Sequence, residues 1–466
     1  MLPMQRLSGL DASFLYLETS SQPMHVCSII ELDTSTVPGG YTFDGLREAL
    51  ALRIKAIPTF REKLANNPLN LDHPVWVDDE KFDIDRHLHR IAVPAPGGRS
   101  ELSQICGHIA EAPLNRGRPL WEMWVIEGVA GTDCHRNGRL AVMTKVHHAG
   151  VDGVTGANLM SQLCATEADA PPPEPAEGVG GAHGWQIAAG GLVRFATRPL
   201  HLANVVPDTV SSVLATLQRA REGLAMARPF AAPGTMFNAR ISERRNVAYA
   251  ELNLDDVKAV KNHFDVKVND VVMALVSGVL RQYLADRNAL PEASLVASVP
   301  VSVHGKSDRP GRNQVSAMFS SLHTEVADPV QRLKAIAEAN SVAKEHSSAI
   351  GASLLQDWTQ FAAPTVFGIA MRIYARTRFT DSMPVHNLVV SNVPGPRVPL
   401  YMLGCEVKSM YPLGPIFHGS GLNVTAMSLQ GKLDVGLIAC PDLLPDLWDM
   451  ADEFAVGMEE LLELAR

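Results

Sequence analysis

Two adjacent histidines, His147 and His148, are followed closely by Asp152 and Gly153. A neutral imidazole has an unperturbed pKa of about 6.5, so it can accept a proton at neutral pH and return it within one turnover. We therefore predict that His148 acts as a general base. Asp152, four residues further along, would orient that ring or anchor its loop through an ion pair.

Two other interpretations of these residues stay open. The histidines could be a hydrogen-bonded pair at the end of a strand, with no role in chemistry. His148 and Asp152 could also bind a metal ion, but no third His, Cys or Glu follows at ligand spacing, and the two neighbouring histidines point apart. We therefore expect no metal at this site.

The segment before the histidines predicts a strand. Residues 140–146 are apolar, carry β-branched side chains at alternate positions and follow an Asn-Gly turn signal. Because side chains alternate between the two faces of a strand, His148 would share a face with Val146, and His147 would point the other way with Lys145. Only one histidine can easily reach a given cleft, so His147 is expected to find a local partner.

Further motifs occur along the chain. They are Leu7-Ser8-Gly9-Leu10-Asp11-Ala12-Ser13-Phe14, Pro119-Leu120-Trp121, Asn269-Asp270 at the start of a predicted helix, and Ser391-Asn392-Val393-Pro394-Gly395-Pro396. His-His-x-x-x-Asp-Gly resembles the signature of the acyl-CoA-dependent acyltransferase superfamily, which includes chloramphenicol acetyltransferases and peptide-synthetase condensation domains. The other motifs resemble the bacterial, mycobacterial-type wax ester synthase/diacylglycerol acyltransferase family, and they follow its order from residue 7 to residue 396.

The resemblance implies an α/β fold of two chloramphenicol-acetyltransferase-like domains, each a mixed sheet flanked by helices, with the active-site tunnel at their interface. Strands and helices that recur in both halves agree with this class. We expect an N-terminal domain over residues 1–165, a linker over 166–237 and a C-terminal domain over 238–466. The linker begins with a Pro- and Gly-rich stretch, a composition that buries too little apolar surface to order itself.

Residues 185–230 are rich in both apolar and basic side chains, within a chain whose net charge is -9. This pattern favours helices that lie on an anionic membrane or on a lipid droplet. The alternative is that the segment crosses between the domains and packs its apolar face on them.

The C-terminal domain has its own pattern of elements. Strands are expected at 247–254, 295–303, 315–322 and 388–391, a hairpin at 422–429 and 433–439, and helices at 255–263, 270–286 and 445–464. Pro445 would occupy the first turn of the last helix, where its missing N–H costs no hydrogen bond.

The resemblance also implies a mechanism without a covalent enzyme intermediate. His148 would take the proton from an alcohol as that oxygen attacks the thioester of acyl-CoA, and would then protonate the leaving thiolate. Asp152 would hold the loop, and His147 would bond locally and tune the site. Asn269 would donate to the oxyanion, or it would only cap a helix together with Asp270.

Several residues are expected to bind substrate or shape the tunnel: Gly153, Pro119, Leu120, Trp121, Asn269, Asp270, Asn392, Pro394 and Gly395. Trp121 has an alternative as a core aromatic, since a Trp buries a large apolar area. The segment from Asn392 onwards has the composition of a rigid turn. No cofactor is expected, because acyl-CoA is a substrate.

One departure from the family concerns the partner of Asp152. Many members carry an arginine soon after Pro-Val-Ser, but here Ser302 is followed by Val and His, and Gly-Arg-Asn313 replaces the usual Gly-Asn. If that arginine pairs with Asp152 in relatives, Arg309 or Arg312 would substitute for it.

Composition is that of a globular protein: 466 residues, of which 46% are hydrophobic and 20% charged. The acidic balance argues against nucleic-acid binding. The six cysteines are scattered without Cys-x-x-Cys, which favours reduced thiols in the cytoplasm. The apolar run at 271–280 is far shorter than the roughly 20 residues needed to span a bilayer, so we expect a buried helix.

We conclude that the sequence predicts a long-chain acyl-CoA-dependent O-acyltransferase that makes triacylglycerol from diacylglycerol. The alternatives are a wax ester synthase that uses a fatty alcohol, and a non-catalytic protein that binds membranes or lipid droplets. A small-molecule acyltransferase is disfavoured by the Pro-Leu-Trp and Asn-Val-Pro-Gly-Pro motifs, and a serine hydrolase by the lack of a Gly-x-Ser-x-Gly segment. The expected location is the cytoplasm, peripherally on the inner membrane or on lipid droplets.

Overall fold

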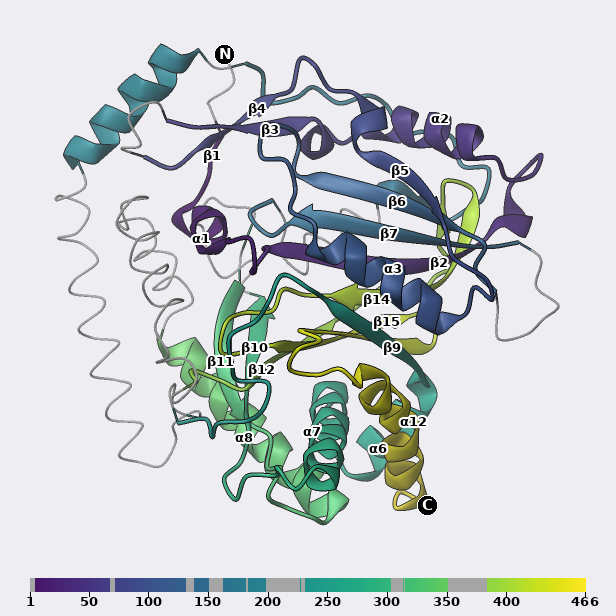
Figure 1. The fold of residues 1–466 in the computed structure, drawn as a ribbon, viewed down its shortest axis with the longest axis vertical. Coiled ribbons are helices and arrows are strands. Elements are labelled where there is room, and N and C mark those ends of the chain that lie inside the picture. Colours follow the sequence, from purple (N-terminus) through teal and green to yellow (C-terminus); the bar gives the residue numbers. More distant parts are fainter. Residues whose placement is uncertain are drawn as a thin grey trace.

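Two large mixed β-sheets, each flanked by helices, lie one above the other in the computed structural model (Figure 1). The structure describes residues 5–67, 72–130, 138–150, 162–181, 183–197, 227, 231–302, 313, 315–350 and 384–466. The α/β class expected from the sequence, with a mixed sheet in each half, is confirmed.

The first sheet has, among the described residues, the strand order β5-β6-β7-β2-β14-β13-β8. The bounds are β2 His25–Asp33, β5 Leu88–Ala92, β6 Trp121–Glu127, β7 Arg139–His147, β8 Cys164–Ala165, β13 Tyr401–Met402 and β14 Cys405–Leu413. Strands β5 and β6 are parallel, and the other neighbours are antiparallel. Two of these strands, β13 and β14, come from the far end of the chain, so the C-terminal half completes the N-terminal sheet.

The second sheet has the order β11-β10-β12-β15-β16-β9 in the described part of the chain. Its bounds are β9 Asn246–Asn253, β10 Val296–Ser302, β11 Val315–Ser321, β12 Leu388–Val393, β15 Leu422–Leu429 and β16 Lys432–Ala439. Strand β12 runs parallel to both β10 and β15, and the remaining pairs are antiparallel. A small third sheet, β1-β4-β3, joins Gln5–Arg6, Val75–Asp78 and Glu62–Ala65.

The labelled helices cover the outer faces of the sheets and the space between them. They are α1 Gly9–Leu17, α2 Phe43–Ile54, α3 Arg99–Glu111, α6 Leu254–His263, α7 Val268–Asp286, α8 Pro329–Ile350 and α12 Leu447–Glu463, with short 3-10 turns at Thr34–Thr36, Pro58–Phe60 and Ile84–Arg86. In Figure 1, α6, α7 and α12 lie below the second sheet and α2 lies beside the first.

The core is divided by the sheets. One buried cluster joins α7, α8 and α12 to the second sheet, and another joins α2 to the outer face of the first sheet. A third cluster lies between the sheets, where Cys106 and Ile109 of α3 pack with Ile29 of β2 and with Val247 and Ile438 of the second sheet. Helix α3 therefore ties the two sheets together.

Most elements expected in the C-terminal half are confirmed, including the strand 247–254, the helix 255–263, the 422–439 hairpin and the buried helix over 271–280, which lies in α7. The position of Pro445 is wrong: α12 begins at Leu447 with Asp446 as its N-cap, so Pro445 precedes the helix and its first turn. The division into domains and linker stays a prediction.

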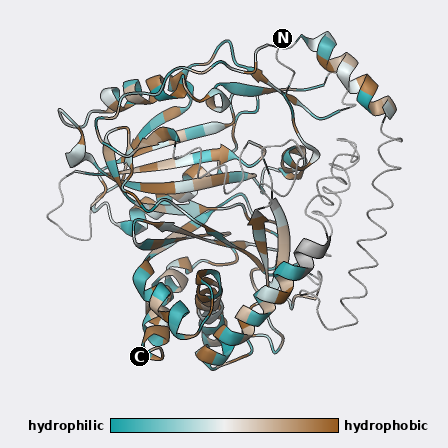
Figure 2. Ribbon diagram, turned by 180° about the vertical axis from the view of Figure 1, so that it is seen from behind, coloured by the Kyte–Doolittle hydropathy of each residue, from teal (hydrophilic) through white to brown (hydrophobic). Residues whose placement is uncertain are grey.

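Part of the predicted basic segment forms a helix over residues 184–197. It projects from the edge of the molecule near the N-terminus, and hydrophobic and hydrophilic residues mix along it (Figure 2). Four of its large apolar side chains are exposed, namely Trp185, Leu192, Val193 and Phe195. Residues 198–226 and 228–230 of the same prediction lie outside the described residues.

Candidate active site

A tight turn carries His148 at the end of β7. The strand ends at His147, and the backbone N–H of Gly150 donates to the His147 carbonyl over 2.9 Å. The Ala149 N–H donates to Nδ1 of the His147 ring over 3.0 Å, and the His148 N–H donates to the carbonyl of Met24 over 2.8 Å. The His147 ring thus closes the turn that presents its neighbour, which is the local hydrogen bond expected for it.

The His148 ring is held from both halves of the chain. Phe14 of α1 stacks on it, with ring centroids 3.9 Å apart and planes inclined by 18°. Its Nδ1 lies 3.0 Å from Oδ1 of Asn313, a residue of the C-terminal half. The Asn313 amide nitrogen in turn donates to the His148 carbonyl over 2.7 Å. One amide therefore contacts both the ring and the backbone of His148.

Helix α1 positions both Phe14 and the partner of Asn313. Its start is fixed by a capping box, in which the Asp11 N–H donates to Ser8 Oγ over 3.0 Å and the Ser8 N–H donates to Asp11 Oδ2 over 3.2 Å. The second carboxylate oxygen, Oδ1, accepts from the Asn313 backbone N–H over 2.9 Å and from its side-chain amide over 2.7 Å. Asp11 and Asn313 are both 1% exposed.

The Pro119-Leu120-Trp121 motif lies against the histidine turn at one point. The Leu120 carbonyl accepts from the His147 N–H over 3.0 Å, and the Leu120 side chain packs with Ala149 and Leu15. This contact extends β6 alongside the end of β7. The motif therefore supports the histidine turn through its backbone.

Trp121 has the surroundings of a core residue. It is 3% exposed, its Nε1–H donates to the Phe60 carbonyl over 2.8 Å, and its ring stacks on His87 with centroids 4.6 Å apart. Burial lowers the pKa of His87, while its hydrogen bond with the Trp121 carbonyl acts in the opposite sense. These contacts favour the core interpretation of Trp121 over contact with substrate.

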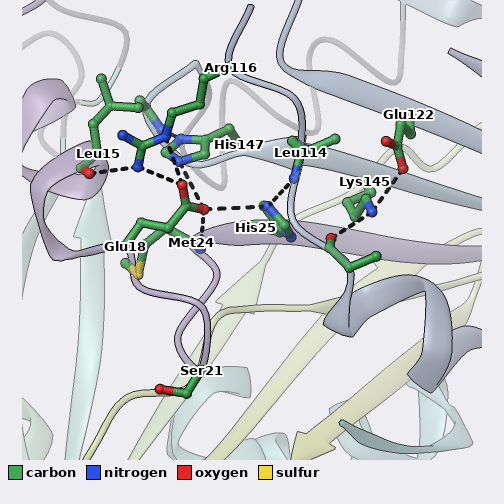
Figure 3. Close-up of polar contacts among 12 residues, drawn as sticks. Leu15, Glu18, Ser21, Met24, His25, Leu114, Arg116, Glu122, Lys145 and His147 are labelled. Atoms are coloured by element: carbon green, nitrogen blue, oxygen red, sulfur yellow. Dashed lines mark hydrogen bonds and ion pairs between the residues drawn. The ribbon is translucent and has the colours of Figure 1, made fainter. Parts of the chain in front are cut away.

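A buried polar network lies behind the turn, centred on Glu18 (Figure 3). One oxygen of Glu18 lies 3.4 Å from Nε2 of His147 and 3.5 Å from Nε2 of His25, and the other accepts from Arg116 over 2.6 and 3.0 Å. Burial alone would raise the pKa of the Glu18 carboxyl, but His147 and Arg116 hold it at about 2. The ionised Glu18 carboxylate therefore holds the His147 ring through its Nε2 side.

His25 is paired with His147 across β2 and β7 and is 4% exposed. Burial lowers its pKa to about 3, and His147 and Lys145 act in the same direction, so its ring is neutral at physiological pH. Nearby, the fully buried Lys145 donates to the Ile109 and Ala112 carbonyls at the end of α3 and lies 2.8 Å from Glu122. A cation at this position complements the helix C-terminus.

Asp270 acts as a helix cap. Its Oδ2 accepts from the Lys267 N–H over 2.9 Å, and its Oδ1 accepts from the Asn340 amide over 2.8 Å. Helix α7 begins at Val268, two residues before the predicted start, so Asn269 lies in its first turn. The cap interpretation of Asp270 is supported, and the role of Asn269 toward an oxyanion stays a prediction.

The Asn392 to Gly395 segment ends β12 and turns closely past β15. The Gly395 N–H donates to Ser428 Oγ over 3.2 Å. A Cβ at position 395 would lie 2.1 Å from the Ser428 carbonyl oxygen, so only glycine fits there. Asn392 lies within the strand and Pro394 is exposed in the turn. The segment is therefore the end of a strand and a closely packed stretch after it, and its role in shaping the tunnel stays a prediction.

Asp152 and Gly153, like Arg309 and Arg312, lie outside the described residues. Within the described residues, no group of three or more His, Cys, Asp or Glu side chains is placed to hold a metal ion. The sequence analysis assigned no role to Asp11, Phe14 and Glu18. The first two were visible only as part of the motif that opens the chain, and Asn313 only as part of a departure from the family pattern.

Two family models and several relatives match this chain. Residues 7–272 match the family model described as wax ester synthase/diacylglycerol acyltransferase catalytic domain, and residues 312–462 match the one described as WS/DGAT C-terminal domain. A protein of Mycobacterium tuberculosis strain H37Rv, provisionally named a diacylglycerol O-acyltransferase, is 58% identical over 99% of this chain and 90% of its own length. A second M. tuberculosis protein with that provisional name is 34% identical over 99% of this chain and 96% of its own.

Solved structures give the same result for the fold. The wax ester synthase/diacylglycerol acyltransferase from Marinobacter aquaeolei VT8 is similar with a TM-score of 0.68 and 29% identity, covering 99% of this chain and 100% of that one. The first condensation domain of the calcium-dependent antibiotic synthetase is similar with a TM-score of 0.57 and 16% identity, covering 99% of this chain and 96% of that one.

Proposed function

Because the chain belongs to the wax ester synthase/diacylglycerol acyltransferase family, we propose that it makes triacylglycerol by moving a long-chain acyl group from acyl-CoA to diacylglycerol. The observation that carries this proposal is the presentation of His148 at the end of β7. Stacking on Phe14 and the hydrogen bond with Asn313 hold an imidazole in one orientation, as a general base requires.

In the proposed reaction, His148 removes the proton of the acceptor hydroxyl as its oxygen attacks the thioester carbonyl carbon. The tetrahedral intermediate then collapses, the C–S bond breaks, and the imidazolium returns the proton to the CoA thiolate. Asn269 is the proposed donor to the oxyanion, and Asp152 the residue that holds the loop. No cofactor enters this scheme.

The choice of diacylglycerol as acceptor is supported by the provisional names of the M. tuberculosis relatives, of which one is 58% identical to this chain. A fatty alcohol is the second candidate, because the Marinobacter protein, whose name includes wax ester synthase, covers the whole length. Both reactions use the same base and the same thioester, so the acceptor alone separates them.

We also propose that the protein works at a lipid surface through the helix of residues 184–197. Trp185 is 70% and Val193 is 63% exposed, and Arg194 between the apolar side chains is about half exposed and pairs with Asp72 over 3.3 Å. Exposed aromatic and aliphatic side chains beside a cation suit the interface of an anionic membrane or lipid droplet. No described helix is long and apolar enough to cross a membrane.

The function is tested with purified protein, palmitoyl-CoA and either diacylglycerol or hexadecanol, by following thiol release and separating the lipid products. Triacylglycerol that forms with the wild-type protein and not with His148→Ala is the expected result. His108→Ala, which removes an exposed histidine on α3, is the matched control and keeps full activity. Wax ester as the main product would move the assignment to the fatty alcohol. If neither alcohol increases thiol release, the result would point to the non-catalytic alternative.

A further inference from the structure

Three groups form a continuous hydrogen-bonded chain behind the His148 ring: the Asp11 carboxylate, the Asn313 amide and the imidazole itself. Asp11 comes from α1, Asn313 from the C-terminal half, and His148 from the end of β7, so the chain joins three distant segments. Both Asp11 and Asn313 are 1% exposed, which keeps bulk water from competing for these hydrogen bonds.

The contacts of Asn313 fix which end of its amide faces the ring. One end lies 2.7 Å from Asp11 Oδ1 and 2.7 Å from the His148 carbonyl. Both of these atoms only accept hydrogen bonds, since the Asp11 oxygens receive the N–H groups of Asn313 and Ser8. The NH2 group must therefore occupy this end.

The amide oxygen then faces Nδ1 of His148 at 3.0 Å. An oxygen acceptor at Nδ1 requires that this nitrogen carries the ring proton, and in a neutral imidazole the lone pair then resides on Nε2. The Asp11 carboxylate sets the orientation of the Asn313 amide. That orientation in turn determines the tautomer of the His148 ring.

We infer that Asn313, anchored by Asp11, is a positioning residue that holds His148 in the Nδ1–H tautomer and so assigns the role of base to Nε2. This inference rests on the proposed function of His148 and adds a role for two residues outside the His-His-x-x-x-Asp-Gly motif. It parallels the carboxylate of serine-protease triads, which also fixes the tautomer of a catalytic histidine.

The neutral amide differs from a triad carboxylate in one respect. A carboxylate next to the ring strengthens its affinity for a proton, whereas an amide oxygen accepts the same hydrogen bond without a full charge. An imidazolium formed next to Asn313 is therefore a stronger acid than one beside a carboxylate. That suits a base that must give its proton to a thiolate in the second half of the reaction.

The direct test is the ¹⁵N spectrum of the histidine side chains in the wild-type protein above pH 7.5, with the His148 signals assigned by their loss in His148→Ala. We expect Nδ1 to be protonated and Nε2 to be unprotonated in the resting protein. The opposite tautomer would overturn the inference. This measurement needs no acyl acceptor, so it stands even where the proposed acyltransferase activity fails its own test.

Two variants then connect the tautomer to turnover. Asn313→Asp keeps the shape of the side chain but places an acceptor against Asp11 and the His148 carbonyl, and Asn313→Ala removes the group. We expect Asn313→Ala to lose the Nδ1–H signature and to lower kcat by about 100-fold, with KM for acyl-CoA unchanged. Asn313→Asp still offers an acceptor oxygen to Nδ1, so it is expected to keep the signature.

Asn253→Ala is the matched control, because it removes an Asn side chain that caps α6 and has no contact with Asp11, Asn313 or His148. It is expected to lower the melting temperature while keeping kcat and the tautomer. Wild-type kcat in Asn313→Ala, or loss of kcat in that variant with the Nδ1–H signature intact, would contradict the positioning role.

Discussion

Phe14 covers one face of the His148 imidazole, with the two ring centroids 3.9 Å apart and the planes inclined by 18°. The contact joins α1 to the turn after β7, and the cluster around Leu7, Ala12 and Leu15 anchors α1 beneath it. The first helix of the chain therefore belongs to the candidate site, although more than 130 residues separate it from the histidine motif in the sequence.

Replacing Phe14 with Ala is expected to lower kcat by about tenfold, since a stacked aromatic pair contributes roughly 0.5–1.5 kcal/mol beyond its buried area. KM for acyl-CoA should change little, because Phe14 acts on the orientation of His148. Phe14→Tyr keeps the ring and serves as the control. Equal activity of the Ala and Tyr variants would show that stacking does not hold the base.

Replacing Glu18 with Gln keeps the shape of the side chain and removes the charge beneath His147. We expect the free energy of unfolding to fall by about 2 kcal/mol, together with a lower kcat as the turn loosens. Denaturant melts of Glu18→Gln, Arg116→Ala and the double variant form a cycle. Because Arg116 donates directly to Glu18, its replacement should cost less in the Glu18→Gln background. Strictly additive costs would mean that the two side chains act independently.

Because of Asp434, we expect the free energy of unfolding to fall as the pH rises. It is fully buried in β16, and its Oδ2 accepts from the Met410 N–H over 2.6 Å. Burial raises its pKa to about 8, opposed by the Met410 N–H and Lys432 and reinforced by Glu251 and Glu31. The folded protein thus binds this proton more tightly than the unfolded chain does. The contribution of the protonated Asp434 carboxyl to stability is complete below pH 4 and is lost as the pH rises toward 8.

Asp434→Asn should remove that dependence while its amide oxygen still accepts from Met410. The gain in the free energy of unfolding is expected to grow with pH between about 4 and 8, by up to about 1.4 kcal/mol per pH unit. Thermal melts of the variant and the wild type at pH 5 and pH 8.5 measure it, with Glu459→Gln on the exposed face of α12 as the control. A gain that is the same at both pH values would refute the raised pKa.

Gly395→Ala is expected to destabilise the protein by about 1–3 kcal/mol, because its Cβ would overlap the Ser428 carbonyl oxygen. The control is Gly181→Ala, where a Cβ meets nothing within 4 Å. Melting temperatures of both variants give the comparison. If the two changes cost the same, the close approach of the two backbones is not a constraint on the fold.

Trp185→Ser combined with Leu192→Ser should reduce binding to phosphatidylglycerol-containing vesicles at least about fivefold, since two exposed apolar anchors are lost. Flotation with vesicles of increasing anionic content measures it. Leu52→Ser and Val456→Ser remove exposed apolar side chains elsewhere on the surface and serve as controls. Equal losses in both double variants would mean that the helix of residues 184–197 has no special role.

The strands and helices that could be predicted are those marked by a pattern of residues close together in the sequence. The alternation of apolar residues before His147 located β7, and the pattern of residues 422–439 located the β15–β16 hairpin. The same period of two predicted opposite faces for His147 and His148, but β7 ends at His147 and His148 lies in the following turn, so the faces of a strand do not describe it. A continuous apolar stretch likewise identified α7 as a buried helix. The stretch is much shorter than the roughly 20 residues that a membrane-spanning helix needs.

The parts that were not predicted depend on contacts between distant residues. Asp11 and Asn313 meet only when the two halves of the chain fold together, and no local pattern distinguishes a buried Asp from an exposed one. Glu18 is one of 50 acidic residues, and its role comes from the placement of Arg116 and two histidines around it. The last helix begins at Leu447, two residues later than predicted, because Pro suits the residue before a cap as well as the first turn.

Strand β14 has a consequence for how the protein is made. In the first sheet it pairs with β2, so that Ile30 lies opposite Met410, roughly 380 residues later in the chain. At a synthesis rate of about 5–20 residues per second, one edge of β2 waits for tens of seconds before its neighbour leaves the ribosome. During that interval β2 presents unpaired backbone groups that other nascent chains can join. A chain that ends before residue 405 therefore lacks β14, the strand that pairs with β2 inside this sheet, and leaves that edge of β2 open to aggregation.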